Sequence, residues 1–578
     1  MKLFFEGVTY PKELIKSYFG DKFHIEESNG CRITAVGYYY NNSQSVCYIL
    51  PKLFIDPINA KYYLNSEIPF LELATYGISR SSLGKEELKN AQSFLILFYQ
   101  SLKEYKYRIH KASISKETLL NLSSSLGSST FSYLDLLLSI VNFYKTHRDT
   151  IVFTQKKLQK RTEKKVNWTK TITKSTPFFI DNKPVYQKVS AKHKVVNTEE
   201  DLMVLFESIV YYIKNTYGLA LTLNNTYETI KGSKFKKVLD RGSRPLRKIK
   251  YKYFSDTMKS IYNMVELFLS KSHTAHSNKE NEEYIIVNSY HQVFEDMIDK
   301  LLTNQTSDQG NDKISRSQLK HHKDGKIIDH IFGFKDLLSD ESSIHYIADS
   351  KYYLPGNELD QNSIYKQFTY AKNTIQLNID AYNSSEKDSM YSSSNYYRDE
   401  LTEGYNITPN LFLKASLNDL VNYNNIELRI IKNRDGSFKS NNSFHFNYRL
   451  FDRDTLYINH YTINYLFVLN QYVNSSYLSL RKTQAYIYDF LRKSTIAFLS
   501  SDDFDYELKK VTFQTLSSLE VFVNSNFKTL NGKIFRTQNK PNELIIALHA
   551  DDIFLKDFLN GLEDDFIIER FLYPQMEL

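Results

Sequence analysis

Two short apolar runs, each carrying an acidic residue, constrain this chain more than any other feature of its sequence. The runs are residues 325–334 (GKIIDHIFGF) and 344–353 (IHYIADSKYY), and polar residues at 340–343 (DESS) lie between them. β-branched and aromatic residues on both sides of a polar connection are typical of two strands joined as a hairpin. Such a hairpin would bring Asp329 and Asp349 together.

The residue types at this hairpin match the needs of phosphodiester hydrolysis. Hard divalent cations such as Mg²⁺ take oxygen ligands from one or two carboxylates and keep several waters for substrate and nucleophile. We therefore expect Asp329 and Asp349 to hold Mg²⁺. Because strand side chains alternate, Lys351 lies on the same face as Asp349, where its ammonium can orient the attacking water or stabilise the charged phosphate.

The triplet Asp349-Ser350-Lys351 gains its meaning from its surroundings. With 66 acids and 74 bases in 578 residues, about eight triplets of the form acid-x-base are expected from composition alone. Upstream, apolar residues at helical spacing over 290–302 predict an amphipathic helix that carries Glu295. Downstream, a polar cluster at Asp360 predicts the start of a second helix. The order is helix with acid, strand with acid, strand with Asp-x-Lys, helix with Gln-x-x-Tyr.

That order resembles the PD-(D/E)XK nuclease superfamily, in the branch whose second helix carries a Gln-x-x-x-Tyr-like motif, here the shorter Gln367-Phe-Thr-Tyr370. The resemblance implies an αβββαβ core with the catalytic residues Asp329, Asp349, Lys351, Glu295, Gln367 and Tyr370, of which Asp329, Asp349 and Glu295 would hold the metal. Two departures are visible. Ile328 replaces the superfamily's proline, and the second acid is Asp rather than Glu.

Three further segments are similar to the LlaJI-type restriction endonucleases, which are McrC-like subunits. The segments are 47–52 (CYILPK), 166–171 (VNWTKT) and 450–467 (LFDRDTLYINHYTINYLF). The resemblance implies a type II or type IV-like restriction endodeoxyribonuclease of an antiviral defence system, acting on double-stranded DNA together with a hexameric McrB-like AAA+ GTPase. No Gly-Lys pair in the chain is followed by Ser or Thr, so a Walker A loop is missing and GTP is expected on the partner.

Other functions fit some of the same residues. A RecB-type nuclease that processes DNA ends shares the Gln-x-x-Tyr helix, and a non-catalytic activator of a partner GTPase could keep the nuclease fold as a scaffold. The intact acids and Lys351 argue against the activator. A histidine-metal nuclease built on His321, His322 or His330 is disfavoured, because neither a cysteine partner nor a His-Asn-His spacing accompanies them.

The length of the chain predicts several domains, because a single core stops growing at about 250–300 residues. We expect a multidomain chain of mixed α/β (α+β) class, in which a small N-terminal sheet with helices precedes the nuclease core. The expected divisions are 1–150 for a β-rich and then helical domain that meets a partner or DNA, 151–275 for a basic helical connection, 276–480 for the nuclease and 481–578 for a helical and β segment packed on it.

Basic residues are concentrated in two segments. Residues 156–174 hold eight bases and one acid, and residues 231–252 hold ten bases and one acid, Asp240. Such segments attract phosphate through counterion release, although a solvated helix face or a disordered arm has the same composition. The candidate contacts with nucleic acid or with the partner are Arg241, Arg244, Arg247, Lys248 and Lys250.

Cysteine content and hydropathy predict a cytoplasmic protein. Cys31 and Cys47 are the two cysteines, too few for a disulfide framework or a cysteine-based zinc site. No run of about 18 apolar residues exists, and an acid at Glu6 interrupts the apolar stretch that a secretory signal would need. We expect no membrane contact.

Overall fold

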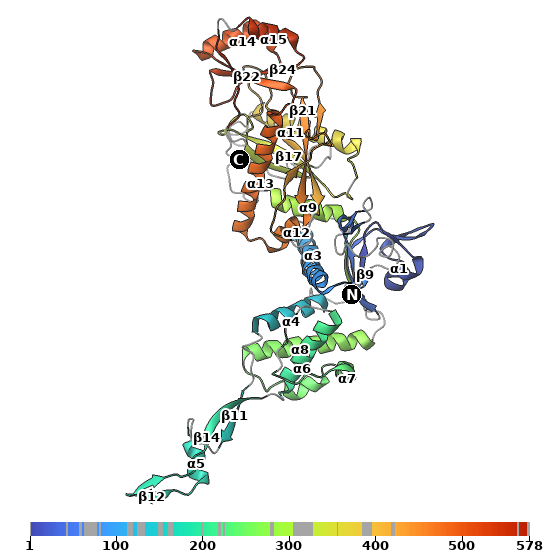
Figure 1. Cartoon of the computed structure of the whole chain (residues 1–578), viewed down its shortest axis with the longest axis vertical. Coiled ribbons are helices and arrows are strands. Elements are labelled where there is room, and N and C mark those ends of the chain that lie inside the picture. The colour runs from blue at the N-terminus through green and yellow to red at the C-terminus, as the bar shows by residue number, and fades with distance from the viewer. Residues whose placement is uncertain are drawn as a thin grey trace.

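The computed structural model of the chain has an elongated, mixed α/β architecture of several parts (Figure 1). It describes residues 2–41, 44–56, 61–62, 78–79, 83–111, 120–123, 133–147, 154–159, 166–197, 200–217, 221–223, 226–277, 282–303, 328–354, 357–383, 396–417, 422–562 and 566–574. The expected multidomain α/β class is confirmed. No helix in these ranges is both long enough and apolar enough to span a membrane.

The N-terminal part is built on a six-stranded sheet. Its strand order is β10 (Leu120–Ser123), β15 (Glu282–Val287), β5 (Val36–Asn41), β6 (Gln44–Leu50), β1 (Lys2–Phe5) and β9 (Ile78–Ser79). Beside it, α1 (Lys12–Phe19) packs on a small sheet of β2 (Thr9–Tyr10), β4 (Gly30–Ile33) and β3 (His24–Glu27). β15 falls in the range expected for the nuclease domain, yet it pairs with β5, so residues 282–287 belong to the N-terminal sheet.

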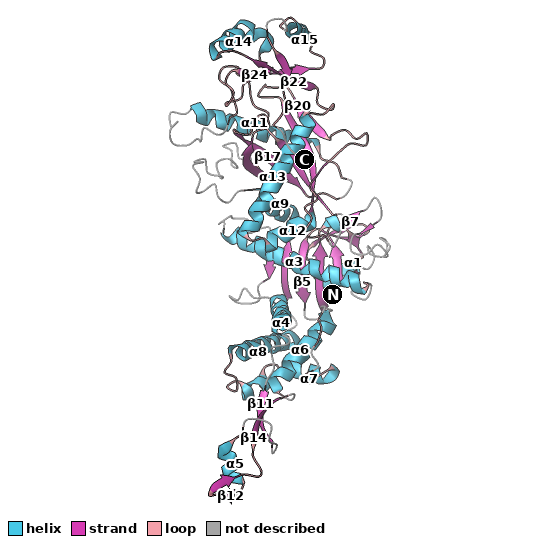
Figure 2. Cartoon of the chain, turned by 60° about the vertical axis from the view of Figure 1, so that its left-hand side comes forward, coloured by secondary structure: helices cyan, strands magenta, loops and turns pink. Residues whose placement is uncertain are grey.

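A helical part follows the N-terminal sheet and carries a projecting arm. The helices are α4 (Tyr133–His147), α6 (Asp201–Tyr217), α7 (Gly232–Arg241) and α8 (Asp256–Ser277), and α8 contacts the other three. The arm leaves this part through the antiparallel pair β11 (Thr154–Gln159) and β14 (Ala191–Val196). Beyond that pair come α5 (Trp168–Lys174) and the hairpin of β12 (Phe178–Ile180) and β13 (Lys183–Val185). Both views show the arm extending away from the rest of the molecule (Figures 1 and 2).

The predicted nuclease motif lies in a second sheet. Its path is β16 (His330–Lys335), β17 (Ser343–Lys351), β18 (Asn410–Ser416), β21 (Leu456–Asn464) and β19 (Arg429–Ile430), and β20 (Ser440–Ser443) also pairs with β21. β16 runs antiparallel to β17, whereas β17, β18 and β21 are parallel neighbours joined in part by α11 (Gln361–Asn383). α9 (Tyr290–Leu302) packs on β16 and β17.

The order α9, β16, β17, α11, β18 follows the expected arrangement of elements. Residues 304–327 lie outside the described residues, so the described chain has two of the three strands expected between the two helices. Further helices flank this sheet. They are α12 (Tyr465–Asn474) and α13 (Tyr477–Leu499), both in contact with α9, and α3 (Lys85–Lys111), which reaches from the N-terminal part to α9 and α12.

The C-terminal residues form a four-stranded sheet with its own small core. The sheet order is β23 (Ile534–Phe535), β24 (Glu543–His549), β22 (Tyr506–Thr512) and β25 (Ile568–Arg570), and α14 (Leu516–Leu530) and α15 (Ile553–Asn560) accompany it. Phe535 stacks on Phe451, with ring centroids 5.4 Å apart, and Arg536 pairs with the buried Asp399 at 2.9 Å. These contacts join the C-terminal sheet to the part that holds the nuclease motif.

Candidate active site

The hairpin of β16 and β17 brings Asp329 and Asp349 together. His330 is the register partner of Ala348, so Asp329, the residue before β16, lies opposite Asp349 near the end of β17. The polar residues of the connection and the apolar residues of the strands therefore produce the juxtaposition that the sequence predicts. The acids lie at the open end of the hairpin rather than at its turn.

Lys351 lies beside Asp349 on the same face of β17. Its Nζ is 2.7 Å from Oδ2 of Asp349, and 5.5 Å from the ring centroid of Phe412, the register partner of Asp349 in β18. Burial lowers the pKa of Lys351, but the attraction and hydrogen bond of Asp349, together with smaller contributions from Tyr353 and Asp329, outweigh it, and the net shift is upward. The lysine is therefore a cation held against the acids.

The two acids oppose each other electrostatically. Burial, followed by repulsion from Asp349, raises the pKa of Asp329 to about 7, against smaller opposing effects of His330 and Lys351. Burial also raises the pKa of Asp349, and the attraction of Lys351 offsets only part of that shift. Without a further positive charge, this pair holds a proton more tightly than ordinary aspartates. A divalent cation would remove that preference.

One oxygen of Asp349 has no N–H or hydroxyl donor in the described part of the chain. Oδ2 accepts from Lys351, whereas the buried Oδ1 has no partner within the described part of the chain. The neighbouring Asp329 donates a hydrogen bond to Asp349 only while it keeps its proton, and once ionised it offers a second oxygen acceptor. A buried, unpartnered carboxylate oxygen next to another carboxylate is an oxygen-rich set of the kind that hard cations prefer. The residues present thus fit Mg²⁺.

One row of α9 runs along the end of the hairpin. His291, Glu295 and Asp299 follow at four-residue intervals, which places them on one helix face. Asp299 Oδ1 lies 3.4 Å from Nδ1 of His330, and the charge of Glu295 contributes to the raised pKa of Asp349. Burial, Lys52 and Lys351 lower the pKa of His291. Half-buried Glu295 therefore lies near the two acids, as expected for a third carboxylate that holds the metal.

Gln367 is engaged elsewhere. It is fully buried in α11, its Nε2 donates to Oδ1 of Asn410 at 2.6 Å, and Nδ2 of Asn410 donates back to the Gln367 carbonyl at 3.3 Å. The pair fastens α11 to the start of β18. Tyr370, one turn further on, is partly buried against the core. Sequence reasoning missed Asn410, because a single Asn carries no pattern.

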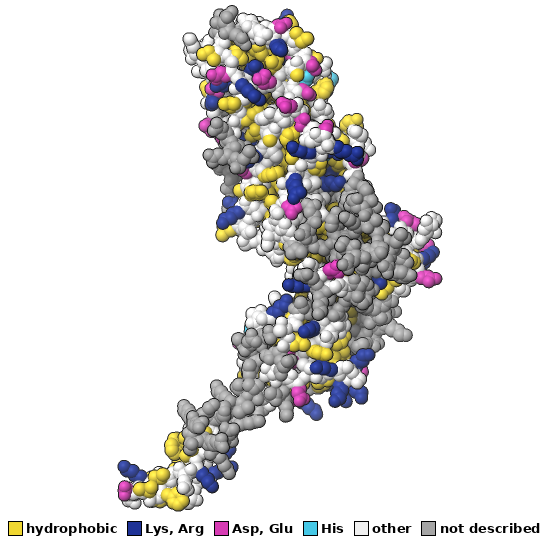
Figure 3. Space-filling model, viewed as in Figure 1, with side chains coloured by type: hydrophobic (Ala, Val, Ile, Leu, Met, Phe, Trp, Pro, Cys, Tyr) yellow, Lys and Arg dark blue, Asp and Glu magenta, His cyan; other side chains and the backbone are white. Residues whose placement is uncertain are grey.

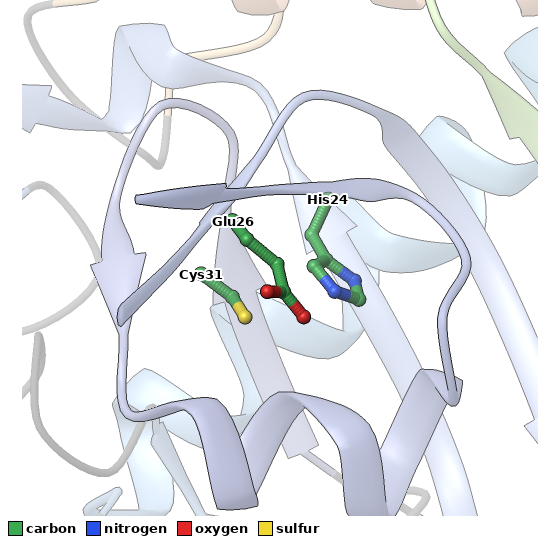
Figure 4. A group of neighbouring side chains, drawn as sticks. All are labelled: His24, Glu26 and Cys31. Carbon is green, nitrogen blue, oxygen red and sulfur yellow. The ribbon is translucent and has the colours of Figure 1, made fainter. Parts of the chain in front are cut away.

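Among the described residues, a different trio places its possible ligand atoms within 4.8 Å of one another: His24, Glu26 and Cys31 of the β3–β4 hairpin (Figure 4). Both carboxylate oxygens of Glu26 are already paired, with Lys16 at 2.9 Å and Lys12 at 2.8 Å. These lysines lower the pKa of Glu26 to about 2. The carboxylate of this trio is therefore already neutralised by lysines, and its Cys31 is buried. Glu295, Asp329 and Asp349 do not all come within 4.8 Å of one another.

The remaining predicted residues lie far from the hairpin of β16 and β17 (Figure 1). Arg241, Arg244, Arg247, Lys248 and Lys250 are exposed on α7 and the turn after it, in the helical part of Figure 1. His321 and His322, which the histidine-metal alternative requires, lie outside the described residues.

Comparisons with known proteins identify no family. No protein-family model matches the chain, and no curated protein sequence matches it. A chain from a solved assembly of Thermococcus gammatolerans McrB AAA+ hexamers with bound McrC matches at 10% identity, over 82% of this chain and 89% of that one, with a TM-score of 0.23. A TM-score of 0.23 is too low to indicate a shared fold.

Proposed function

We propose that this chain is a Mg²⁺-dependent DNA endonuclease, the nuclease subunit of a GTP-dependent restriction system of the McrBC or LlaJI kind. The observation that carries the proposal is the position of three side chains. Asp329 and Asp349 meet at the open end of a hairpin, and Lys351 is ion-paired to Asp349 on the same face. Two adjacent acids and a lysine are the groups that metal-assisted phosphodiester hydrolysis needs.

Each group has its own role in this reaction. Asp329 and Asp349, with Glu295 nearby, would hold Mg²⁺, which supplies the charge that activates water and polarises the phosphate. The Lys351 ammonium stabilises negative charge that develops on the phosphate. Its partner Asp349 fixes the position of this ammonium, because the 2.7 Å contact restricts an otherwise flexible side chain. The Gln367–Asn410 pair holds α11 against the sheet.

Dependence on a partner GTPase rests on two features of the sequence. The segments 47–52, 166–171 and 450–467 are similar to McrC-like subunits, and a Walker A loop is missing.

The arm offers a surface that could contact this partner. At its end Phe178, Phe179 and Ile180 are 60–69% exposed, and Trp168 and Ile172 of α5 are also exposed. Apolar side chains gather at this end of the space-filling view (Figure 3). Exposed apolar patches of this kind mark protein-binding surfaces.

Reconstitution with a McrB-like AAA+ GTPase tests the proposal. The purified chain should bind no GTP, yet accelerate GTP hydrolysis by that protein. Replacing Phe178 and Phe179 with Ser should reduce the acceleration, whereas the same change at exposed Phe444 and Phe446, outside the arm, should not. GTP binding by the isolated chain, or no effect on the partner, would contradict the proposal.

A further inference from the structure

Basic residues on α7 form one continuous line along its exposed side. Phe235 and Leu239 are buried and hold the helix against its neighbours. At 100° per residue, Lys234, Lys237 and Arg241 fall opposite that buried face. Gly242 then ends the helix with a φ of +58°, a conformation that favours glycine, and the chain turns into a 3₁₀ helix.

The 3₁₀ helix η3 (Arg244–Ile249) continues the line. With three residues per turn, side chains three apart lie one above the other, about 6 Å apart along the axis at 2.0 Å per residue. Leu246 and Ile249 therefore share the buried edge. Arg244, Arg247 and the following residue Lys250 share an exposed edge. We call Lys234, Lys237, Arg241, Arg244, Arg247 and Lys250 the basic stripe.

The charges of the basic stripe are not neutralised by any described acid. Residues 231–252 include one acid, Asp240. Nearby Lys252 is paired with the buried Glu200 at 2.9 Å, but none of the six stripe residues forms an ion pair in the part of the chain that the structure describes. Lys and Arg side chains gather over α7 in Figure 3. Six unpaired cations on a packed scaffold create a strong local positive potential.

Two exposed rings lie at the end of the stripe. Tyr251 and Phe254 are 83% and 84% exposed, and Nζ of Lys250 lies 5.8 Å from the ring centroid of Tyr251. Aromatic rings beside unpaired cations are the combination that binds nucleic acid, since sugars and bases stack on the rings while the cations meet phosphates. Protein-binding surfaces are instead depleted of lysine, of which the stripe has three.

We propose that the basic stripe binds the phosphate backbone of double-stranded DNA, at a site separate from the carboxylates on β16 and β17. The inference rests on the proposed function, because DNA is the substrate of that function. A second DNA contact on the helical part would hold the substrate while the hairpin acts on it. Its binding would not depend on base sequence, because phosphates carry none.

Binding can be measured without cleavage. The full chain carrying Asp349→Ala is mixed, in EDTA, with a fluorescent 30-base-pair duplex, and anisotropy is recorded from 50 to 300 mM salt. The test variant adds Lys234→Gln, Lys237→Gln and Lys250→Gln. The matched control adds the same change at three exposed lysines elsewhere, Lys482, Lys528 and Lys556. Thermal unfolding checks that both variants fold.

The stripe variant should bind DNA more than about tenfold more weakly at 0.15 M salt, and its plot of log affinity against log salt should be shallower by about two to three, since each phosphate contact contributes about 0.9. The control should match the parent. Equal affinities and slopes for both variants would overturn the proposal. So would normal DNA binding combined with reduced stimulation of the partner GTPase, which would assign the stripe to protein. Failure of the nuclease itself would appear separately, in cleavage assays with Mg²⁺.

Discussion

Glu6 and Tyr352, 346 residues apart, are joined by a 2.5 Å hydrogen bond from the tyrosine hydroxyl to Oε2 of the glutamate. Tyr352 directly follows Lys351, and Glu6 directly follows β1 of the N-terminal sheet. The backbone N–H of Lys52 also donates to Glu6 at 3.2 Å, and Nζ of Lys52 lies 4.8 Å from the centroid of the Tyr352 ring. The N-terminal sheet is thus fastened to the strand end that carries the candidate catalytic lysine.

Removing the hydroxyl of Tyr352 should weaken this junction. Tyr352→Phe leaves the largely buried Glu6 carboxylate with one donor fewer, which costs about 1–3 kcal/mol of unfolding free energy. Denaturant unfolding measures the loss, and Tyr365→Phe, at an exposed tyrosine of α11, provides the control. Cleavage should fall as well, because the end of β17 loses a support. Unchanged stability and unchanged cleavage would show that the junction is not needed.

Lys351→Ala should reduce Mg²⁺-dependent cleavage by about 10²–10³-fold, the usual effect of removing one group that stabilises transition-state charge. Mg²⁺ binding should persist, since the acids remain. Lys335→Ala on β16, which removes a more exposed lysine of the same hairpin, should leave cleavage unchanged. Equal activity of the two variants would remove Lys351 from the mechanism.

Proton competition should make Mg²⁺ binding dependent on pH. Asp329 has a pKa of about 7 because of burial and Asp349, so below pH 7 it must lose a proton before it can bind metal. Mg²⁺ affinity should rise about tenfold per pH unit up to about 7 and then level off. Calorimetry at pH 6, 7 and 8 in two buffers of different ionisation enthalpy checks both the affinity and the released proton. Constant affinity without proton release would contradict the assignment.

The same shift predicts how stability depends on pH without metal. The folded chain holds this proton more tightly than the unfolded chain, whose aspartate has a pKa near 3.8. Stability is therefore highest below pH 3.8 as far as this group is concerned, and its contribution is lost as the pH rises from 3.8 to about 7. Asp329→Asn should flatten that part of the stability profile, as measured by thermal unfolding in EDTA. An unaltered profile would assign the pH dependence to other groups.

Gln367 should act through structure rather than through the reaction. Gln367→Leu and Asn410→Leu should each cost about 1–3 kcal/mol, because the first leaves Oδ1 of Asn410, and the second leaves Nε2 of Gln367, buried without its hydrogen-bond partner. The double variant should cost less than the sum of the two, since it leaves neither group unpaired. Additive costs from denaturant unfolding would contradict this view, and Gln367 would return to the catalytic role implied by the superfamily.

Local signals predicted much of the motif but not its surroundings. The hairpin follows from β-branched runs around a polar connection, and α11 begins where Asp360 predicts, with Oδ1 of Asp360 accepting from the N–H of Ser363 at 3.3 Å. In contrast, nothing in the sequence of β15 indicates which sheet it joins. Its partner β5 lies more than 240 residues earlier. The pairing of Gln367 with Asn410 and of Glu6 with Tyr352 likewise depends on tertiary packing.

Cleavage of covalently closed plasmid tests the proposed restriction nuclease most directly. Closed circular DNA should be cut only when this chain, the AAA+ partner, GTP and Mg²⁺ are all present, and Asp349→Ala should abolish cutting while still supporting GTP turnover, because hydrolysis resides on the partner. If Asp349→Ala cuts as well as the parent, the site is wrong. If the chain alone degrades linear DNA from its ends and leaves closed circles intact, it is a RecB-like end-processing nuclease instead.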